Sequence, residues 1–309
     1  MATVKDSIPH MIRTAEDSRQ QGVWTAHLSK IEQVNSKIRL LRLSLPREGP
    51  PLRHMPGQYI DLYIPNVDVV GGFTITSPPQ SASSQHHPSP HIELAIQDSP
   101  SNPPAAYLWR PVPEILNSAV TFRVGGNFAY PPLTLSRDQC ASIDRVVLVA
   151  GGVGINPIMS MISAMDEMGT RSTLGGMAKT VRILYTARRD HSPSSDGGGG
   201  QVEEVLFEKR LNGIAQKWNN HEQVDYRYTF FETSGGGDSD AQDEVAENIT
   251  HRYRRIRHDD LFEALGPEDT RNKTVVYVCG LPTMTDEFVE LLKQAKGMDE
   301  ERVLCEKWW

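Results

Sequence analysis

Apolar and polar residues alternate along the first half of the chain, and this period of two is typical of half-buried strands. The alternation is clear at residues 24–29, 59–64, 92–97 and 120–124. Pro and Gly turns separate these stretches, so together they predict an antiparallel β-barrel. The segment from Pro78 to Pro90 is rich in Ser, Gln, His and Pro and offers no core-forming residues, which predicts a surface insertion between two strands.

From Arg145 onward apolar strands alternate with helical periods, which predicts βα units around a parallel sheet. Ile158, Met161, Ile162 and Met165 fall at i, i+3, i+4 and i+7, so they form one apolar stripe that would pack on the sheet. We expect strands at 146–150, 181–185, 224–231 and 274–278, helices at 158–165, 202–211, 260–265 and 284–295, and polar loops at 192–200 and 234–240.

The single change of period marks the predicted domain boundary. We expect an N-terminal tail at 1–22, with its disorder left open, a β-barrel domain at 23–138 and an α/β domain at 143–309. A chain of 309 residues with a hydrophobic share of 38% has room for these two cores. The predicted fold class is therefore a two-domain protein, an antiparallel β-barrel followed by an α/β parallel-sheet domain.

The charge balance argues against a nucleic-acid surface, because the formal net charge is −7. The basic run at 251–258 is flanked by acidic residues at 238–247 and 259–260, which favours a solvated loop face. The three cysteines, Cys140, Cys279 and Cys305, form no close pair, so we expect free thiols in a reducing compartment, with no disulfide framework, iron-sulfur cluster or other metal site.

Targeting signals are absent from the sequence as it stands. No apolar stretch approaches the ~20 residues that a membrane helix needs, so we expect a soluble protein without a membrane span. Residues 1–22 carry three Lys or Arg residues and three acidic ones, whereas a transit peptide should be poor in acids. Read at face value, this N-terminus predicts a cytoplasmic protein.

The most informative motif is the strand at 145–150 with the turn that follows it, Gly151-Gly152-Val153-Gly154-Ile155-Asn156-Pro157. Its glycines allow a phosphate to approach bare backbone N–H groups, and Pro157 suits the first turn of a helix whose N-terminus favours an anion. This pattern predicts a dinucleotide-binding turn. A tight connection after a buried strand is the alternative interpretation.

A second motif follows a second strand. Residues 274–278 lead into Cys279-Gly280-Leu281-Pro282-Thr283-Met284 and a helical period. Both motifs lie at the C-terminal ends of their strands, the edge of a parallel sheet where ligands bind in open α/β folds. A phosphate-binding turn and a thiol are thus predicted at one edge.

These motifs resemble those of the ferredoxin-NADP reductase superfamily. The residues that carry the resemblance are 70–74 (Val-Gly-Gly-Phe-Thr), 151–157, 279–286 and 306–309 (Glu-Lys-Trp-Trp), four separated motifs in order over residues 24–309. The resemblance implies a flavin-binding barrel facing a nicotinamide-binding domain, and it favours a mitochondrial location. The segment Pro56-Gly57-Gln58-Tyr59-Ile60 is similar to the family's entry into the flavin-side strand, with a plain type II turn as the alternative.

The resemblance also implies roles for individual residues. Phe73 would stack on the flavin ring, Thr74 would reach toward its N5, Cys279 would position the nicotinamide C4, and the terminal Trp308 and Trp309 would cover the flavin. Catalytic roles thus fall to Cys279 and Thr74. The implied cofactor-binding residues are Phe73, Thr74, Ser77, Gly151, Gly152, Gly154, Pro157, Arg188, Cys279, Gly280, Pro282, Met284 and Trp309. The alternatives are a buried structural cysteine at 279 and a frayed hydrophobic tail at the C-terminus.

Two departures from the family pattern concern the flavin diphosphate. Gly71 stands where the family has an Arg that would bond the diphosphate. Pro103 and Pro104 stand in the second diphosphate segment and remove two N–H donors. The basic residues that could compensate are Arg53, Arg110 and Arg123. The sequence therefore leaves three possibilities open: the barrel binds FAD, it binds FMN, or it binds no flavin.

Residues at the end of the second parallel strand are expected to select between NAD and NADP. A carboxylate there would accept the ribose 2′-OH of NAD, and an Arg would pair with the 2′-phosphate of NADP. Arg188 and Arg189 permit NADP, Asp190 lies slightly late to exclude it, and the resemblance favours NAD. NAD is therefore the predicted coenzyme, with NADP not excluded.

Two functions follow. The first is a flavin-dependent NAD(P)H oxidoreductase that transfers a hydride from nicotinamide C4 to flavin N5 and passes electrons to an unidentified quinone, haem protein or small molecule. The second is a non-catalytic NAD-binding protein with a degenerate flavin site, acting as a partner or sensor subunit. Gly71 and Pro103-Pro104 favour the second. Phe73-Thr74, Cys279 and the terminal Trp308-Trp309 pair favour the first, which is the prediction adopted.

Overall fold

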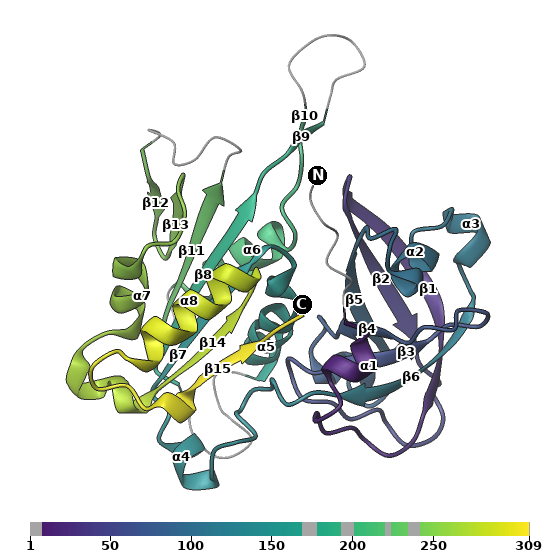
Figure 1. Cartoon of the computed structure of the whole chain (residues 1–309), viewed down its shortest axis with the longest axis horizontal. Coiled ribbons are helices and arrows are strands. Elements are labelled where there is room, and N and C mark those ends of the chain that lie inside the picture. The colour runs from purple at the N-terminus through teal and green to yellow at the C-terminus, as the bar shows by residue number, and fades with distance from the viewer. Residues whose placement is uncertain (1–7, 169–177, 193–200, 220–223, 234–241, 309) are drawn as a thin grey trace.

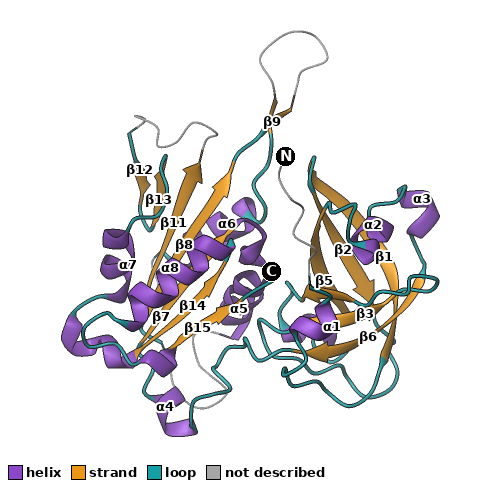
Figure 2. Ribbon diagram, in the orientation of Figure 1, coloured by secondary structure: helices purple, strands orange, loops and turns teal. Residues whose placement is uncertain are grey.

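The computed structural model describes residues 8–168, 178–192, 201–219, 224–233 and 242–308. Figure 1 shows two bodies side by side, the N-terminal one a curved sheet and the C-terminal one a sheet covered by helices. The C-terminus lies between them, and Figure 2 shows that loops connect them below.

The first body is a six-stranded antiparallel sheet in the order β4-β3-β6-β1-β2-β5. Its strands are β1 (Trp24–Asn35), β2 (Ile38–Ser44), β3 (Tyr59–Tyr63), β4 (Gly71–Thr74), β5 (His91–Gln97) and β6 (Ala119–Gly125). A bridge between Ile75 and Leu94 joins the two end strands and closes the barrel. The prediction of an antiparallel barrel is thus confirmed.

One barrel strand, β2, was not predicted. Its sequence, Ile-Arg-Leu-Leu-Arg-Leu-Ser, has two adjacent leucines and no strict alternation, so the period of two is hidden there. The insertion at 78–90 also needs a correction. It begins with a 3₁₀ turn at Pro79–Ala82, and Ala82 is only 2% exposed in the barrel core, so this segment is not wholly a surface loop.

The second body is a seven-stranded sheet in the order β12-β13-β11-β8-β7-β14-β15, parallel except for β12. Its strands are β7 (Arg145–Gly151), β8 (Thr180–Arg188), β11 (Asp225–Thr233), β12 (Glu244–Ala246), β13 (Ile249–Arg252), β14 (Thr274–Cys279) and β15 (Val303–Glu306). The strand order reverses between β7 and β14, and ligands of open α/β sheets bind at such a reversal.

Helices cover both faces of this sheet. The helices are α5 (Ile155–Met168), α6 (Glu208–Trp218), α7 (His258–Leu265) and α8 (Pro282–Lys293). One apolar cluster joins α5 and α6 to the sheet and another joins α7 and α8 to it, so the two pairs lie on opposite faces. The predicted stripe of α5 is buried. The predicted helix at 202–211 was wrong in its range, because Val202 belongs to β10 (Gln201–Val202), which pairs with β9 (His191–Ser192), and the helix begins at Glu208.

Polar contacts and apolar packing hold the two bodies together. Asn156 and Ser160 of α5 donate to the carbonyls of Ala95 and Ser77, at 3.1 and 2.9 Å. The hydroxyl of Tyr277 donates to the Ala129 carbonyl at 2.8 Å. Three further helices lie between the strands of the two bodies in the chain: α2 (Pro103–Leu108) and α3 (Val112–Ile115) follow β5, and α4 (Arg137–Ala141) follows β6. Helix α5 therefore packs between sheet and barrel, which fixes the glycine-rich turn at its N-terminus relative to the barrel.

The N-terminal segment is not a free tail from residue 8 onward. Helix α1 (His10–Arg13) packs beside the barrel, His10 is 7% exposed, and Arg19 pairs with Gly125 of β6 in an isolated bridge. The described part of the expected N-terminal tail is therefore attached to the barrel, which a short polar segment without a periodic signal does not reveal.

The basic run at 251–258 is also less exposed than expected. Arg252 ends β13, and it and Arg254 are half-buried in ion pairs with Asp260 at 2.5 and 2.6 Å, so this run is not a solvated loop face throughout. The loops expected at 192–200 and 234–240 lie outside the described residues apart from Ser192. Among the described residues, no helix has both the length and the apolar character needed to span a bilayer.

Candidate functional site

The glycine-rich turn forms the first part of the site. Strand β7 ends at Gly151, a 3₁₀ turn spans Gly152–Gly154, and α5 starts at Ile155, which places Pro157 in its first turn. Gly152 is exposed with φ +54°, and open space surrounds the position of its missing Cβ. Such a backbone conformation favours glycine and leaves the turn uncovered for a phosphate.

The second motif lies in direct contact with the first. A Cβ on Gly154 would come within 2.2 Å of the Cys279 carbonyl oxygen, and a Cβ on Gly280 within 3.0 Å of the Gly151 backbone nitrogen. The Met284 side chain packs against Gly151 and Gly280. The structure therefore brings the two predicted motifs together at the point where the strand order reverses, through backbone contacts that only glycines permit.

Cys279 is buried at the end of β14. Its register neighbours are Ala150 of β7 and Glu306 of β15, and it is only 1% exposed. Burial, reinforced by the nearby Glu306 and Cys305, raises the pKa of the Cys279 thiol well above its usual range. The thiol is neutral at physiological pH, so it suits packing against a ring rather than nucleophilic attack.

Glu306 is a candidate residue that sequence reasoning missed. Burial raises the pKa of its carboxyl group to about 8, and the Trp308 indole N–H donates to it at 2.9 Å, which limits the rise. The sequence signal was present, because Glu306 opens the terminal Glu-Lys-Trp-Trp motif. In the sequence alone it has no feature that distinguishes it from an ordinary polar residue. The parallel pairing of β14 with β15 places it beside Cys279.

A cavity of about 580 Å³ opens beside Glu306, between the C-terminal strand and the N-terminal segment. Its walls include Arg13, Asp17, Phe128, Lys293, Glu306 and Trp308. The cavity thus brings together two aromatic rings, a carboxyl group with a raised pKa and the cationic side chains of Arg13, Lys293 and Lys307.

The predicted flavin face lies on β4. Thr74 is buried at 5% exposure opposite Tyr59 of β3, and Phe73 is half-buried. The Phe73 ring folds back over Gly71, where a Cβ would meet ring atom Cε2 at 2.5 Å and Pro104 at 2.7 Å. Ser77 is used inside the protein, since its hydroxyl accepts from the Glu93 N–H and its carbonyl from Ser160.

This face fits a flavin only in part. Phe73 and Thr74 supply an aromatic ring and a hydroxyl for the flat ring system. The diphosphate end, by contrast, is an apolar contact between Phe73, Gly71 and Pro104. Of the three arginines that could compensate, Arg123 pairs with Asp61, Arg110 pairs with Glu114 and Arg53 is exposed.

Trp308 lies at the junction of the barrel, the C-terminal strand and α1. Its ring is stacked on His10 with centroids 6.0 Å apart and lies edge-on to Tyr59 at 5.6 Å. The prediction that named Trp309 falls on a residue outside those the structure describes. Of the two terminal tryptophans, Trp308 is therefore the one that the structure describes, and it lies beside the barrel.

The arginines at the end of β8 differ from each other. Arg189 is held by Glu208 and Glu232 at 2.6 and 2.8 Å, which satisfies its charge. Arg188 is exposed and pairs with Asp190 at 2.7 Å, and Asp190 also pairs with Lys37 of the barrel. A 2′-phosphate would have to compete with Asp190 for Arg188.

Comparison with known proteins assigns the chain to a family. No protein family model matches it. Oxidoreductase NAD-binding domain-containing protein 1 of Danio rerio is 31% identical over 301 residues, an alignment that covers 97% of each chain. The chain belongs to this family.

Solved structures agree in fold. The CS-b5R domains of human Ncb5or in the NAD⁺ form match with a TM-score of 0.62 at 18% identity, over 94% of this chain and 70% of that one. The flavohemoglobin of Malassezia yamatoensis with bound FAD and heme matches with a TM-score of 0.61 at 15% identity, over 96% and 62%. These matches confirm the predicted fold class.

Proposed function

We propose that this protein is an NAD(P)H-dependent flavin oxidoreductase, with an NAD site where the order of the parallel strands reverses and a site on the barrel face for a flavin, which would supply the hydride acceptor. The observation that carries the proposal is the contact of two glycine motifs there, Gly151–Gly154 against Cys279–Gly280. Family membership and the reductase fold make a pyridine-nucleotide oxidoreductase the expected class.

The residues have separate roles in this proposal. The exposed turn at Gly152 and the N-terminus of α5 bind the diphosphate of the coenzyme, because their backbone N–H groups and the helix dipole favour an anion. Pro157 presets the first helical turn. The neutral thiol of Cys279 positions the nicotinamide, and Pro282 and Met284 support the adjoining Gly280 backbone. The protein supplies alignment and shielding, and the cofactors carry the chemistry.

The barrel face has the second set of roles. Phe73 and Thr74 would hold the ring system of the flavin, which supplies an acceptor for the hydride when it is bound. Glu306 holds a proton beside the cavity near neutral pH, within reach of Trp308. Both FMN and FAD are compatible with the ring-binding residues. The onward electron acceptor, a protein or a small molecule, stays a prediction, and no residue is assigned to it. The two predicted locations, mitochondrial and cytoplasmic, also stay predictions.

A second function has one observation in its favour. The Phe73 ring and Pro104 fill the space beside Gly71 where a diphosphate-binding arginine would start. A barrel closed in this way would belong to a nucleotide-binding protein that acts as a partner or sensor subunit without a flavin.

The visible absorption spectrum of the purified protein, recorded anaerobically before and after NADH or NADPH, separates the two functions. The proposal expects flavin bands near ~450 nm that bleach with NADH. No bands after incubation with FAD and FMN would favour the second function. Cys279→Ala should slow the bleaching and leave the flavin content unchanged, and equal rates in variant and parent would remove the role given to Cys279.

A further inference from the structure

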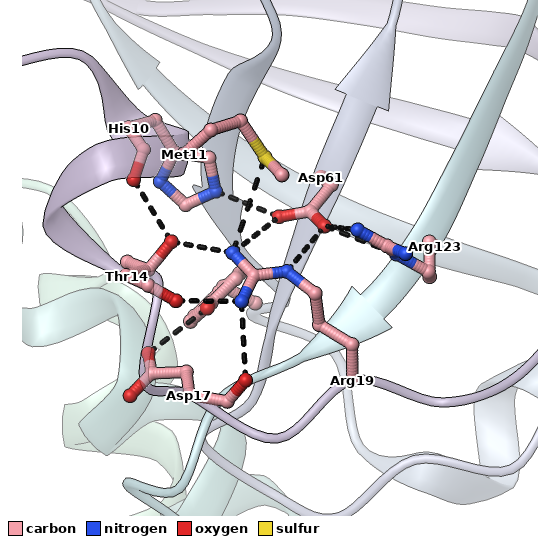
Figure 3. Close-up of polar contacts among 8 residues, drawn as sticks. His10, Met11, Thr14, Asp17, Arg19, Asp61 and Arg123 are labelled. Atoms are coloured by element: carbon pink, nitrogen blue, oxygen red, sulfur yellow. Dashed lines mark hydrogen bonds and ion pairs between the residues drawn. The ribbon is translucent and has the colours of Figure 1, made fainter.

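A buried carboxylate anchors the N-terminal segment, residues 8–22, to the outer face of the barrel. Asp61 of β3 is fully buried, and His10, Arg19 and Arg123 contact it at 2.8, 2.8 and 2.9 Å (Figure 3). Burial alone would raise the pKa of Asp61, but these three partners outweigh burial and hold it well below its usual range. Two of the three partners belong to the N-terminal segment, so this segment is bound tightly to the barrel.

The His10 ring occupies a narrow space against the predicted flavin strand. A Cβ on Gly72 of β4 would lie 2.1 Å from His10 Nδ1. The same ring lies edge-on to Tyr59 at 5.1 Å and is stacked on Trp308 with an interplanar angle of 16°. A flat heteroaromatic ring of the chain itself thus lies between two aromatic side chains beside β4.

This position of His10 is not fully satisfied. Its Nε2 bonds to Asp61, but its Nδ1 is buried and has no hydrogen-bond partner among the described residues. A buried polar atom without a partner costs free energy, so the contact is weaker than its packing suggests. A competing ring could therefore displace it.

Arg13 connects the same segment to the C-terminus. Its guanidinium donates to the Trp308 carbonyl oxygen at 2.8 Å and lies over the Trp308 ring, 5.3 Å from the centroid. Arg13 and Trp308 also line the cavity beside Glu306. Helix α1 thus contacts β4 through His10 and the C-terminal residue Trp308 through Arg13.

We propose that the N-terminal segment is an internal strap, which closes the barrel face by placing His10 between Tyr59 and Trp308 and must move away before a flavin ring can enter. The strap rests on the proposed flavin site and adds a condition to it. Flavin binding and strap attachment compete, so a flavin that binds loosens residues 8–22 and a weaker strap raises flavin affinity.

The test uses the full chain and three variants in α1. His10→Ala removes the inserted ring while Arg19 and Arg123 still neutralise Asp61, and Arg13→Ala removes the bond to Trp308 without touching Asp61. Ile12→Ala is the matched control, because Ile12 is 67% exposed on the same helix. Amide hydrogen exchange of residues 303–308 reports on the strap, and titration with FMN and with FAD reports on the flavin site.

The strap predicts that His10→Ala and Arg13→Ala speed exchange at 303–308 by about tenfold and raise flavin affinity by a similar factor, while Ile12→Ala behaves like the parent. Unchanged exchange in both variants would overturn the strap, and so would a loss of flavin affinity, which would show that α1 helps to build the flavin site. If no protein binds flavin, the proposed flavin role fails, whereas the exchange rates still decide whether the strap exists.

Discussion

The coenzyme edge of the α/β sheet and the flavin face of the barrel differ in what fills them. At the coenzyme edge, backbone meets backbone at Gly154 and Cys279, and the turn at Gly152 stays open. At the barrel face, side chains of the chain itself take the space, with Phe73 over Gly71 and His10 against Gly72. In the proposed function, a coenzyme could therefore bind at the open edge directly, whereas the barrel face would have to rearrange before it held a flavin.

The largest predicted effect comes from the anchor of the barrel face. Asp61→Ala leaves Arg19 and Arg123 buried in part without their carboxylate, which should lower the free energy of unfolding by about 3–5 kcal/mol. Urea denaturation measures the loss. Asp286→Ala is the control, because Asp286 forms an exposed pair with Lys307 and should cost less than about 1 kcal/mol. Equal losses of stability in Asp61→Ala and Asp286→Ala would show that Asp61 does not anchor the N-terminal segment.

Asp61 also predicts a pH dependence. Its pKa is lowered on folding from a usual value of 3.8, so its contribution to stability is present above about pH 4 and disappears as the pH falls below that value. Denaturation curves of the parent should therefore shift to lower urea in this acid window, and those of Asp61→Ala should shift less.

The next effect concerns the coenzyme edge. Gly154→Ala would place a Cβ 2.2 Å from a carbonyl oxygen that belongs to a buried strand, and neither backbone can yield easily. We expect a loss of about 3 kcal/mol in the free energy of unfolding, with weaker NADH binding. Gly213→Ala on α6 has open space around it and should instead stabilise the protein by about 0.5–1 kcal/mol. A Gly154→Ala variant as stable as the parent would contradict the close contact.

Glu306 predicts a dependence of stability on pH that is opposite in sign to that of Asp61. Its folded pKa of about 8 lies above the usual 4.5, so the folded state binds the proton more tightly and stability falls as the pH rises from about 5 to about 8. The loss should be about 3 kcal/mol in the parent and absent in Glu306→Gln. Thermal denaturation at a series of pH values measures both proteins. If their stability changed with pH in the same way, the pKa of this carboxyl group would not be raised.

The smallest effect is expected in coenzyme choice. Asp190→Asn frees the exposed Arg188 from its ion pair, so the variant should bind NADP about threefold more tightly relative to NAD than the parent does. Competition titrations of the two coenzymes measure the ratio. An unchanged ratio would show that Arg188 does not reach the 2′-position.

The sequence predicted the coenzyme edge better than the barrel face for a physical reason. Gly151, Gly154 and Gly280 leave a pattern in the sequence because close contacts exclude a side chain there, and Gly152 does so because its positive φ favours glycine. The contacts of His10 with Asp61 and of Glu306 with Cys279 join positions far apart in the chain, and no local period marks them. Helix α6 was placed too early because residues 202–207 are apolar enough to extend a helical pattern although Phe207 has φ +63°.

The central claim is that a pyridine nucleotide binds on the open turn at Gly152, and calorimetric titration with NADH tests it most directly. Asn and Asp both tolerate the positive φ of this position, so Gly152→Asn and Gly152→Asp form a pair that differs mainly in charge beside the bound diphosphate. The account predicts that the parent binds NADH, that the Asn variant binds within a few-fold of it, and that the Asp variant binds at least about tenfold more weakly than the Asn variant. Equal affinities of the two variants, or no binding by the parent, would contradict it.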